Sequence, residues 1–538
     1  MAKTGKGWVQ PQQVQQEYRQ GVEYKRGLGA CGMYEQNRIN ERFYSGDQWY
    51  GANCGDSRPL VRHNVIKRIG DYKMAVVGAA PVSVRFSAEG VADTAAIRQQ
   101  VEDYRLALRQ GETAKEPTLV AAQQQAAAQA LTDYFATTAR RLKLDNLKQK
   151  VLRNAYIAGT GVLYTYWEKD IGTGQYADDA HTTPIRGDIV SEVLEIEQVY
   201  MGDVTLEDLQ QQPYILIAQR RPVALLQRMA KQNGCREWQH IRGDEEDNTG
   251  HATLLTRFWK QDNGAGEYTV HAVQVCGDVT VRATWDMGLH LYPLATFSWE
   301  EKRHSAYGES EIPYLIPNQI AINRTVSAGV WAVMMMGMPI MLVNGDVVTQ
   351  PITNDPGQVI PVYGSGEEVK DAVRYVDPPA FSAQLDNNVH NLIADTMSQA
   401  GVSSTLLGDV QPTNTSAIIA VREASLMPLQ MMQNRFYGFL EDVARIWSEF
   451  WIAMYGCRGL KIEQEQGTWY MPFDSARYRD MLLDIRVDVG AGDAYSETRT
   501  VETLDNLYSH GVITAKQYLS RLPKGSVPRL DSLLQELT

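Results

Sequence analysis

Two segments with helical apolar spacing flank a short, proline-containing stretch in the middle of the chain. Residues 312–338 are largely apolar and stop before Pro339, which predicts a long helix. Residues 380–400 carry an apolar stripe in steps of four, four, three and five residues from Phe381. Between them, residues 340–378 combine prolines and glycines with short Val and Ile runs, a pattern typical of a small β-rich module.

A polar loop and a long amphipathic helix are predicted after the second of these helices. The loop extends to residue 415 and is rich in Gly, Ser, Thr and Asn, and loops of this length often have a function. Thr415 or Ser416 is suited to cap the following helix. Apolar residues then recur at three- and four-residue steps as far as Met454, and residues 482–489 have the character of a strand.

Helical patterns precede a β-rich region in the N-terminal half of the chain. Residues 9–43 and 118–158 each have the composition of a helix, and Val82–Phe86 alternates apolar and polar positions as a half-buried strand does. From residue 162 to 299, runs of β-branched and aromatic residues indicate several strands. This order predicts an α+β protein with about three folding units.

The C-terminal tail, from Ser496 onward, has the pattern of two or three short helices. Thr514 and Gln517 stand at the spacing of a capping box, in which a hydroxyl and a side-chain amide satisfy each other's backbone N–H groups. The tail therefore predicts a small helical ending rather than a further large domain.

Charge and cysteine content narrow the class of protein. The net charge of −12 argues against a sequence-specific DNA binder, because tight binding to duplex DNA uses many cationic side chains. It is compatible with a conduit along which DNA slides, and equally with an ordinary acidic soluble protein. The five cysteines are scattered, which predicts reduced thiols and no disulfide framework, and the N-terminus lacks the apolar core of a signal peptide.

The sequence contains no recognisable catalytic or cofactor motif. It has no phosphate-binding loop of the G-x-x-x-x-G-K-[ST] type, no H-E-x-x-H, no G-x-S-x-G and no close Cys/His cluster. We therefore expect no catalytic residue, metal or cofactor, and no enzyme. Two alternatives stay open: a soluble hydrolase that uses carboxylates of the β-rich region, and a membrane pore built on the apolar residues Val326–Val343.

Short motif pieces between about residue 40 and residue 425 resemble the portal proteins of tailed bacteriophages, especially those of short-tailed phages. Their order and spacing make the resemblance specific, although each piece alone is weak. In order along the chain, the pieces are Phe43-Tyr44-x-Gly46-Asp47-Gln48-Trp49; Arg58-Pro59 with Asn64-x-Ile66; Ala158-Gly159-Thr160-Gly161; Tyr307-Gly308-Glu309-Ser310 with Pro317-Asn318-Gln319 and Asn323; and Gly401-Val402 through Leu407-Gly408 to Thr415-Ser416.

The resemblance implies a portal fold with an α/β wing, a two-helix stem, a β-rich clip and a short helical crown. The implied parts are residues 1–300 as the N-terminal part of the wing, 301–339 as the first stem helix, 340–378 as the clip, 379–401 as the second stem helix, 402–415 as the tunnel loop, 416–490 as the wing return with its long helix, and 491–538 as the crown.

The implied function is that of a homo-oligomeric, about dodecameric ring at one vertex of the viral capsid. Such a ring is the channel for DNA packaging and ejection, and the platform on which the terminase and head-tail connector proteins dock. The implied partners are further copies of the chain, double-stranded DNA without sequence specificity, the terminase large subunit, connector or adaptor proteins, and the major capsid and scaffolding proteins, with no membrane. The implied location is the virion, and the host cytoplasm during assembly.

Three groups of residues become candidates for this function. An apolar stripe on each stem helix is expected to pack against neighbouring copies, whereas the plain interpretation of the methionine run is ordinary core. For Lys370 and Arg374 of the clip, contact with DNA or a partner competes with simple surface charge. The stem residues are Phe381, Leu385, Val389, Leu392, Met334 and Met338, and the tunnel-loop residues are Ser403, Ser404, Thr405, Asp409, Gln411, Thr413 and Asn414.

Overall fold

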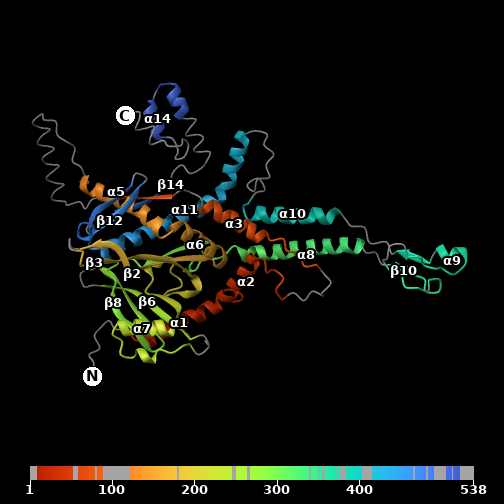
Figure 1. Ribbon diagram of the computed structural model, residues 1–538, viewed down its shortest axis with the longest axis horizontal. Helices are drawn as coiled ribbons and strands as arrows, with labels where there is room; N and C mark the ends of the chain where they lie inside the picture. The colour runs from red at the N-terminus through yellow and green to blue at the C-terminus, as the bar shows by residue number, and fades with distance from the viewer. Residues whose placement is uncertain are drawn as a thin grey trace, which may run out of the picture. The chain divides into compact units, whose positions relative to one another are not determined.

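A computed structural model places helices and strands in two compact units, and its mixed content confirms the α+β class (Figure 1). Unit 1 comprises Met1–Ile39, Asp71–Glu311 and Thr413–Thr538, and unit 2 comprises Asn40–Gly70 and Ile312–Pro412. The structure describes residues 9–51, 59–78, 82–88, 122–177, 181–244, 250–262, 267–337, 341–348, 350–353, 358–370, 372–375, 383–402, 415–464, 467–479, 483–489, 504–511 and 513–521.

An antiparallel sheet of five strands, in the order β4-β5-β6-β7-β8, lies in unit 1. Because side chains alternate along a strand, its two faces carry separate cores. Leu255 packs in the core that helix α1 (Pro11–Gly27) covers, while the adjacent Leu254 packs in the core under helix α7 (Val223–Gln232). The strands are β4 (Val199–Met201), β5 (Ile215–Pro222), β6 (His251–Asp262), β7 (Tyr268–Cys276) and β8 (Val279–Asp286).

A three-stranded antiparallel sheet, in the order β3-β2-β9, packs against helices α6 and α11 in the same unit. Trp447 of α11 is fully buried, and its Nε1 donates hydrogen bonds to Thr165 Oγ1 (3.2 Å) and Ser191 Oγ (3.1 Å) on β2 and β3. The indole thus fills the core and satisfies two strand hydroxyls. The elements are α6 (Leu144–Ala158), β2 (Thr160–Tyr176), β3 (Pro184–Glu195), β9 (Leu294–Ser298) and α11 (Thr415–Met454).

Two further strand pairs and several short elements complete unit 1. The alternation predicted for residues 82–86 is confirmed: Val84 and Phe86 are buried, Ser83 and Arg85 are exposed, and the strand pairs with the predicted strand near residue 489. The elements are β1 (Val82–Ala88) with β14 (Leu483–Val489), β12 (Cys457–Gln464) with β13 (Gly467–Asp474), α5 (Ala122–Arg141), α12 (Ser475–Tyr478), α14 (Ala515–Arg521), η1 (Ile196–Gln198), η2 (Leu209–Gln211) and η3 (Trp238–His240).

Two segments that the sequence pattern treats as single helices are each divided. Residues 9–43 form α1 and then α2 (Met33–Ser45), separated by a turn with two glycines at positive φ. Within the predicted segment 118–158, the described residues from 122 onward are divided between α5 and α6, where Lys143 adopts a left-handed conformation with φ of 53°. The helical character predicted for both segments is confirmed, although neither is a single helix. Three glycines, Gly27, Gly29 and Gly32, mark the first break in the sequence, whereas good helix formers surround Lys143 and mask the second.

Unit 2 is built on two helices that run side by side in opposite directions, α8 (Ile312–Gly337) and α10 (Ala383–Gln399) (Figure 1). Between them in the sequence come a small antiparallel pair, β10 (Met341–Val343) with β11 (Val373–Tyr375), and the short helix α9 (Gly366–Lys370). Helix α3 (Val65–Gly78) begins in this unit. Within the part of the chain that the structure describes, no helix has both the length and the apolarity needed to cross a bilayer.

The predicted capping box at the C-terminal end is present. Thr514 N donates to Gln517 Oε1 (3.1 Å), and Gln517 N donates to Thr514 Oγ1 (3.3 Å) at the start of α14. The reciprocal pair explains why this short helix begins at Ala515.

Candidate functional site

The helix pair of unit 2 exposes apolar side chains that a single chain does not cover. Leu315 and Ile322 of α8 and Met397 of α10 are buried. Farther along α8 the apolar residues are exposed, with Val333 at 57% and Met334 at 46%. In the part of the chain described, most exposed large apolar side chains belong to unit 2: Tyr50, Leu60, Tyr314, Val330, Val333, Met334, Met335, Leu342, Val343, Val359, Val362, Tyr363, Val369 and Val373.

The small module that lies between α8 and α10 in the sequence, within residues 341–375, has a core of its own. Val347, Val348 and Ala372 are buried together, and Tyr363 N donates to Val347 O at 3.1 Å. Its strands have only three residues each, and a two-stranded ribbon of this size is marginal without further packing. The surrounding exposed Val, Leu and Tyr side chains are the kind of surface that marks a contact site.

The predicted site residues fall into three groups in the structure. Val389 and Leu392 are half-buried, Met334 is exposed, and Lys370 and Arg374 are exposed and form no ion pair with any described residue. Leu385 lies within α10, but its side chain is not described. The residues outside the described ranges are Phe381, Met338, Ser403, Ser404, Thr405, Asp409, Gln411, Thr413 and Asn414. The roles of all of these residues stay predictions.

A buried hydrogen-bond network joins three of the motif pieces within unit 2. Gln319 Oε1 accepts from Val65 N (2.9 Å) and Ile66 N (3.2 Å), so the amide satisfies two N–H groups at the start of α3. Gln319 Nε2 donates to His63 O (2.7 Å) and to Asn323 Oδ1 (3.0 Å). Asn323 Nδ2 in turn donates to Gln48 Oε1 at 2.6 Å.

In unit 1, the piece that ends at Gly161 meets the Tyr307–Ser310 part of a piece already described, through a close approach of glycines. Gly308 N donates to Thr160 Oγ1 at 2.8 Å, and Ser310 Oγ donates to Tyr156 O at 2.6 Å. A Cβ on Gly308 would lie 2.6 Å from Gly159 O, and a Cβ on Gly159 would lie 2.4 Å from Gly308 O. Because neither distance is compatible with a side chain, both positions require glycine.

The motif residues are therefore structural contacts. Their partners lie far away in sequence: 275 residues separate Gln48 from Asn323, and 148 separate Thr160 from Gly308. Sequence reasoning used these residues only as markers of a resemblance. The four-residue spacing of Gln319 and Asn323 on one helix was a usable signal, since it places both amides on the same face.

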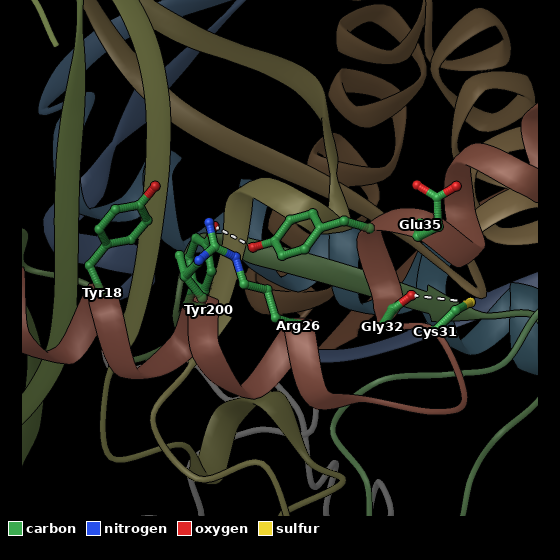
Figure 2. Close-up of a pocket in the computed structure, with 8 residues that line it drawn as sticks. Tyr18, Arg26, Cys31, Gly32, Glu35 and Tyr200 are labelled. Carbon is green, nitrogen blue, oxygen red and sulfur yellow. Dashed lines mark hydrogen bonds between the residues drawn. The ribbon is translucent and has the colours of Figure 1, made fainter. Parts of the chain in front are cut away.

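A pocket of about 470 Å³ lies in unit 1 between α1, the following turn, α2 and β4 (Figure 2). Tyr18, Arg26 and Tyr200 line one part of it, and Cys31 and Glu35 line another, as Figure 2 shows. Tyr34 and Tyr200 share a hydrogen bond of 3.0 Å. Burial raises the pKa of both phenols further above neutral pH, and both offer hydroxyl groups rather than phenolates. The sequence reasoning did not find this pocket.

Two buried cations anchor this unit. Lys25 Nζ donates to Ile196 O (2.5 Å), Val199 O (2.6 Å) and Glu197 O (3.2 Å), while its burial lowers its pKa well below the ordinary value. Three carbonyl acceptors use all three N–H groups of an ammonium, which opposes the effect of burial. Lys73 Nζ lies 2.6 Å from Glu311 Oε1, a buried ion pair that also holds the carboxylate near Trp299. Both lysines are therefore bound by groups of the same chain.

The described residues contain no group of three or more His, Cys, Asp or Glu side chains placed to hold a metal ion. A search of protein-family models and of curated proteins finds no match to this chain.

Proposed function

We propose that this protein is a phage portal: a closed ring of about twelve copies through which double-stranded DNA enters and leaves a capsid. In this proposal α8 and α10 form the stem, residues 340–378 the clip and residues 402–415 the tunnel loop. The chain would serve as a channel and a docking platform, without catalysis, and the terminase would supply the energy for DNA movement.

The observation that carries the proposal is the exposed apolar surface of the helix pair and its small module. Exposed apolar patches on a soluble chain favour association, and repeated copies can bury them in a closed ring. A ring interface joins two different surfaces of each copy, so it does not require a self-complementary patch. The ordered motif pieces add the resemblance to portal proteins. The network around Gln319 and the glycine contact at Gly308 show what structural contacts residues of those pieces form.

The acidic net charge fits a channel that must release its DNA. A strongly cationic wall would bind phosphates and slow passage, whereas a weakly charged polar wall lets a duplex slide. Lys370 and Arg374 are exposed cations in the clip, and repetition around a ring would multiply their weak, salt-screened contacts.

Electron microscopy of the purified full chain under negative stain tests the proposal, together with native mass spectrometry for the number of copies. We expect rings with a central hole and a mass near twelve chains. A chain that remains monomeric over a range of protein concentration, salt and temperature would refute the proposal.

A loop deletion separates assembly from DNA transport. Removing residues 403–414 should leave ring formation intact, because the helix pair is untouched, but should reduce DNA packaging or retention in a reconstituted packaging assay. Wild-type packaging by the deletion variant would remove the role assigned to the tunnel loop, while leaving the ring itself unaffected.

A further inference from the structure

One short segment of unit 1 has the opposite charge from the rest of the chain. Residues 220–242, which we call the basic module, contain six Lys and Arg residues and one acidic residue, Glu237, in a protein of net charge −12. The cations are Arg220, Arg221, Arg228, Lys231, Arg236 and Arg242. Charge concentrated in this way sets a local potential that the net charge of the protein does not describe.

The basic module is held rigidly on the large sheet. Leu226 and Ala230 of α7 and Ile241 are buried in the core that covers one face of β6, β7 and β8. The turn after α7 is fixed by Gly234 at φ of 77°, with Cys235 N donating to Ala230 O at 2.9 Å. The backbone that carries the charged side chains is therefore held in place by a packed core.

Four of the cations have no carboxylate partner among the residues that the structure describes. Arg228, Lys231, Arg236 and Arg242 are exposed and form no ion pair with any residue that the structure describes. Lys231 lies over the ring of Trp238, at 5.5 Å from its centroid. The acidic residue within the module, Glu237, is exposed, and Asp244, two residues after it ends, accepts a hydrogen bond from Thr253 Oγ1 at 2.7 Å. Glu245, Glu246 and Asp247 follow in the sequence but lie outside the described residues.

The composition of the surface favours a nucleic-acid backbone over an acidic protein. Interfaces between proteins usually have an apolar core with aromatic anchors. In the described part of the basic module, Leu225 is the one large apolar side chain that is exposed, at 42%. A phosphate backbone requires only positioned cations, each of which displaces a counterion.

From these observations we infer that the basic module is a binding surface for the phosphate backbone of double-stranded nucleic acid, without sequence specificity. It is distinct from the channel of the proposed function and does not depend on it, since the surface is complete within one chain. Arg228 and Lys231 lie three residues apart on α7 and so share a helix face, and Arg236 lies in the turn that follows.

The test uses the full-length protein and a small, covalently closed circular DNA duplex of arbitrary sequence. A closed circle cannot thread through a closed ring, so channel passage does not contribute to the binding. Affinity is measured by gel shift over a series of salt concentrations for the wild type and two triple variants. The test variant is R228E/K231E/R236E, and the control is K150E/K169E/R186E, which makes the same change of charge at exposed residues elsewhere in unit 1.

We expect the test variant to lose affinity by roughly tenfold or more at moderate salt, and the slope of log affinity against log salt to fall by roughly two to three. The control should lose less affinity. A second variant with glutamine at the same three positions checks the result, and circular dichroism verifies that each protein is folded.

Three outcomes would overturn the inference. The test and control variants could lose affinity to the same extent, which would mean that only net charge matters. The salt slope of the test variant could equal that of the wild type. The wild type could bind immobilised poly-glutamate but not the duplex, which would assign the surface to an acidic protein instead.

Discussion

The two units of this protein use their apolar residues in different ways. The largest fully buried side chains of the described residues, including Trp299, Trp447 and Trp451, belong to unit 1, with Ile66 as the exception in unit 2. Most of the exposed large apolar side chains belong to unit 2. Unit 1 therefore has the core of an ordinary globular protein, whereas unit 2 keeps apolar surface that association would bury.

Unit 2 therefore combines buried polar contacts with exposed apolar side chains. Its interior is organised by the amides of Gln319, Asn323 and Gln48, which satisfy buried backbone groups and so specify one arrangement. Its helix surface is left apolar. Substitutions of the exposed apolar residues of unit 2 should therefore affect assembly, whereas substitutions of buried residues in either unit should affect folding.

The largest effect is expected from charges on the exposed face of α8. Val333→Asp together with Met334→Asp should abolish ring assembly, because the charges would be buried without partners between copies. The free energy of unfolding of the single chain should change by less than about 0.5 kcal/mol, since both side chains are exposed in it.

Sedimentation velocity and a thermal unfolding curve measure these two quantities. Asn391→Asp on α10 is the control, because it adds charge at an exposed polar position. Intact rings in the double variant would show that this face lies outside the interface.

Removing the central indole of unit 1 should produce the next largest effect. Trp447→Ala should lower the free energy of unfolding by about 3–5 kcal/mol, through lost burial and the cavity that remains. Trp447→Phe should lower the free energy of unfolding by less, because Thr165 Oγ1 and Ser191 Oγ keep their hydrogen bond to each other at 2.9 Å. Urea unfolding followed by circular dichroism measures both, and equal losses for the two variants would contradict the packing argument.

Breaking the amide network should destabilise unit 2 rather than unit 1. Gln319→Leu leaves Val65 N and Ile66 N buried without the acceptor they now have. The free energy of unfolding should therefore fall by roughly 2–4 kcal/mol. Gln399→Leu is the matched control, since its contact with Asn318 is exposed. Hydrogen exchange at the start of α3, read by mass spectrometry, locates the effect; unchanged protection there would contradict the assigned role.

The close approach of the two glycines predicts a smaller loss. Gly308→Ala should lower the free energy of unfolding by about 2–3 kcal/mol. Its Cβ would lie 2.6 Å from Gly159 O, so the backbone must move. Gly172→Ala has open space around its Cβ and should change stability by less than about 0.5 kcal/mol. Differential scanning fluorimetry compares the two, and similar melting temperatures would argue against the close contact.

The smallest effect concerns pH. Burial raises the pKa of Glu449, whose carboxylate accepts hydrogen bonds from His290 N and Leu291 N. The folded state then holds the proton at a higher pH than the unfolded chain, so stability falls as pH rises from the unfolded to the folded pKa. Glu449→Gln should flatten this part of the profile, measured by urea unfolding between about pH 4 and pH 7. An unchanged profile would mean that Glu449 does not titrate in that range.

Local sequence determined the elements whose pattern repeats within a few residues. The alternation of Val84 and Phe86, the capping box at Thr514 and the apolar run of α8 were predicted correctly, because strand and helix periodicities and capping bonds involve only near neighbours. The break at Lys143 was missed, since a left-handed residue among good helix formers leaves no trace in composition.

Only the tertiary structure decided what the individual residues do. The partners of Gln319 and Gly308 lie more than a hundred residues away, and no local pattern indicates a contact formed by folding over that distance. The basic character of residues 220–242 is plain in the sequence, but whether its cations are paired depends on which carboxylates the fold brings near. Local chemistry selects the helices and strands, whereas burial and pairing are properties of the packed chain.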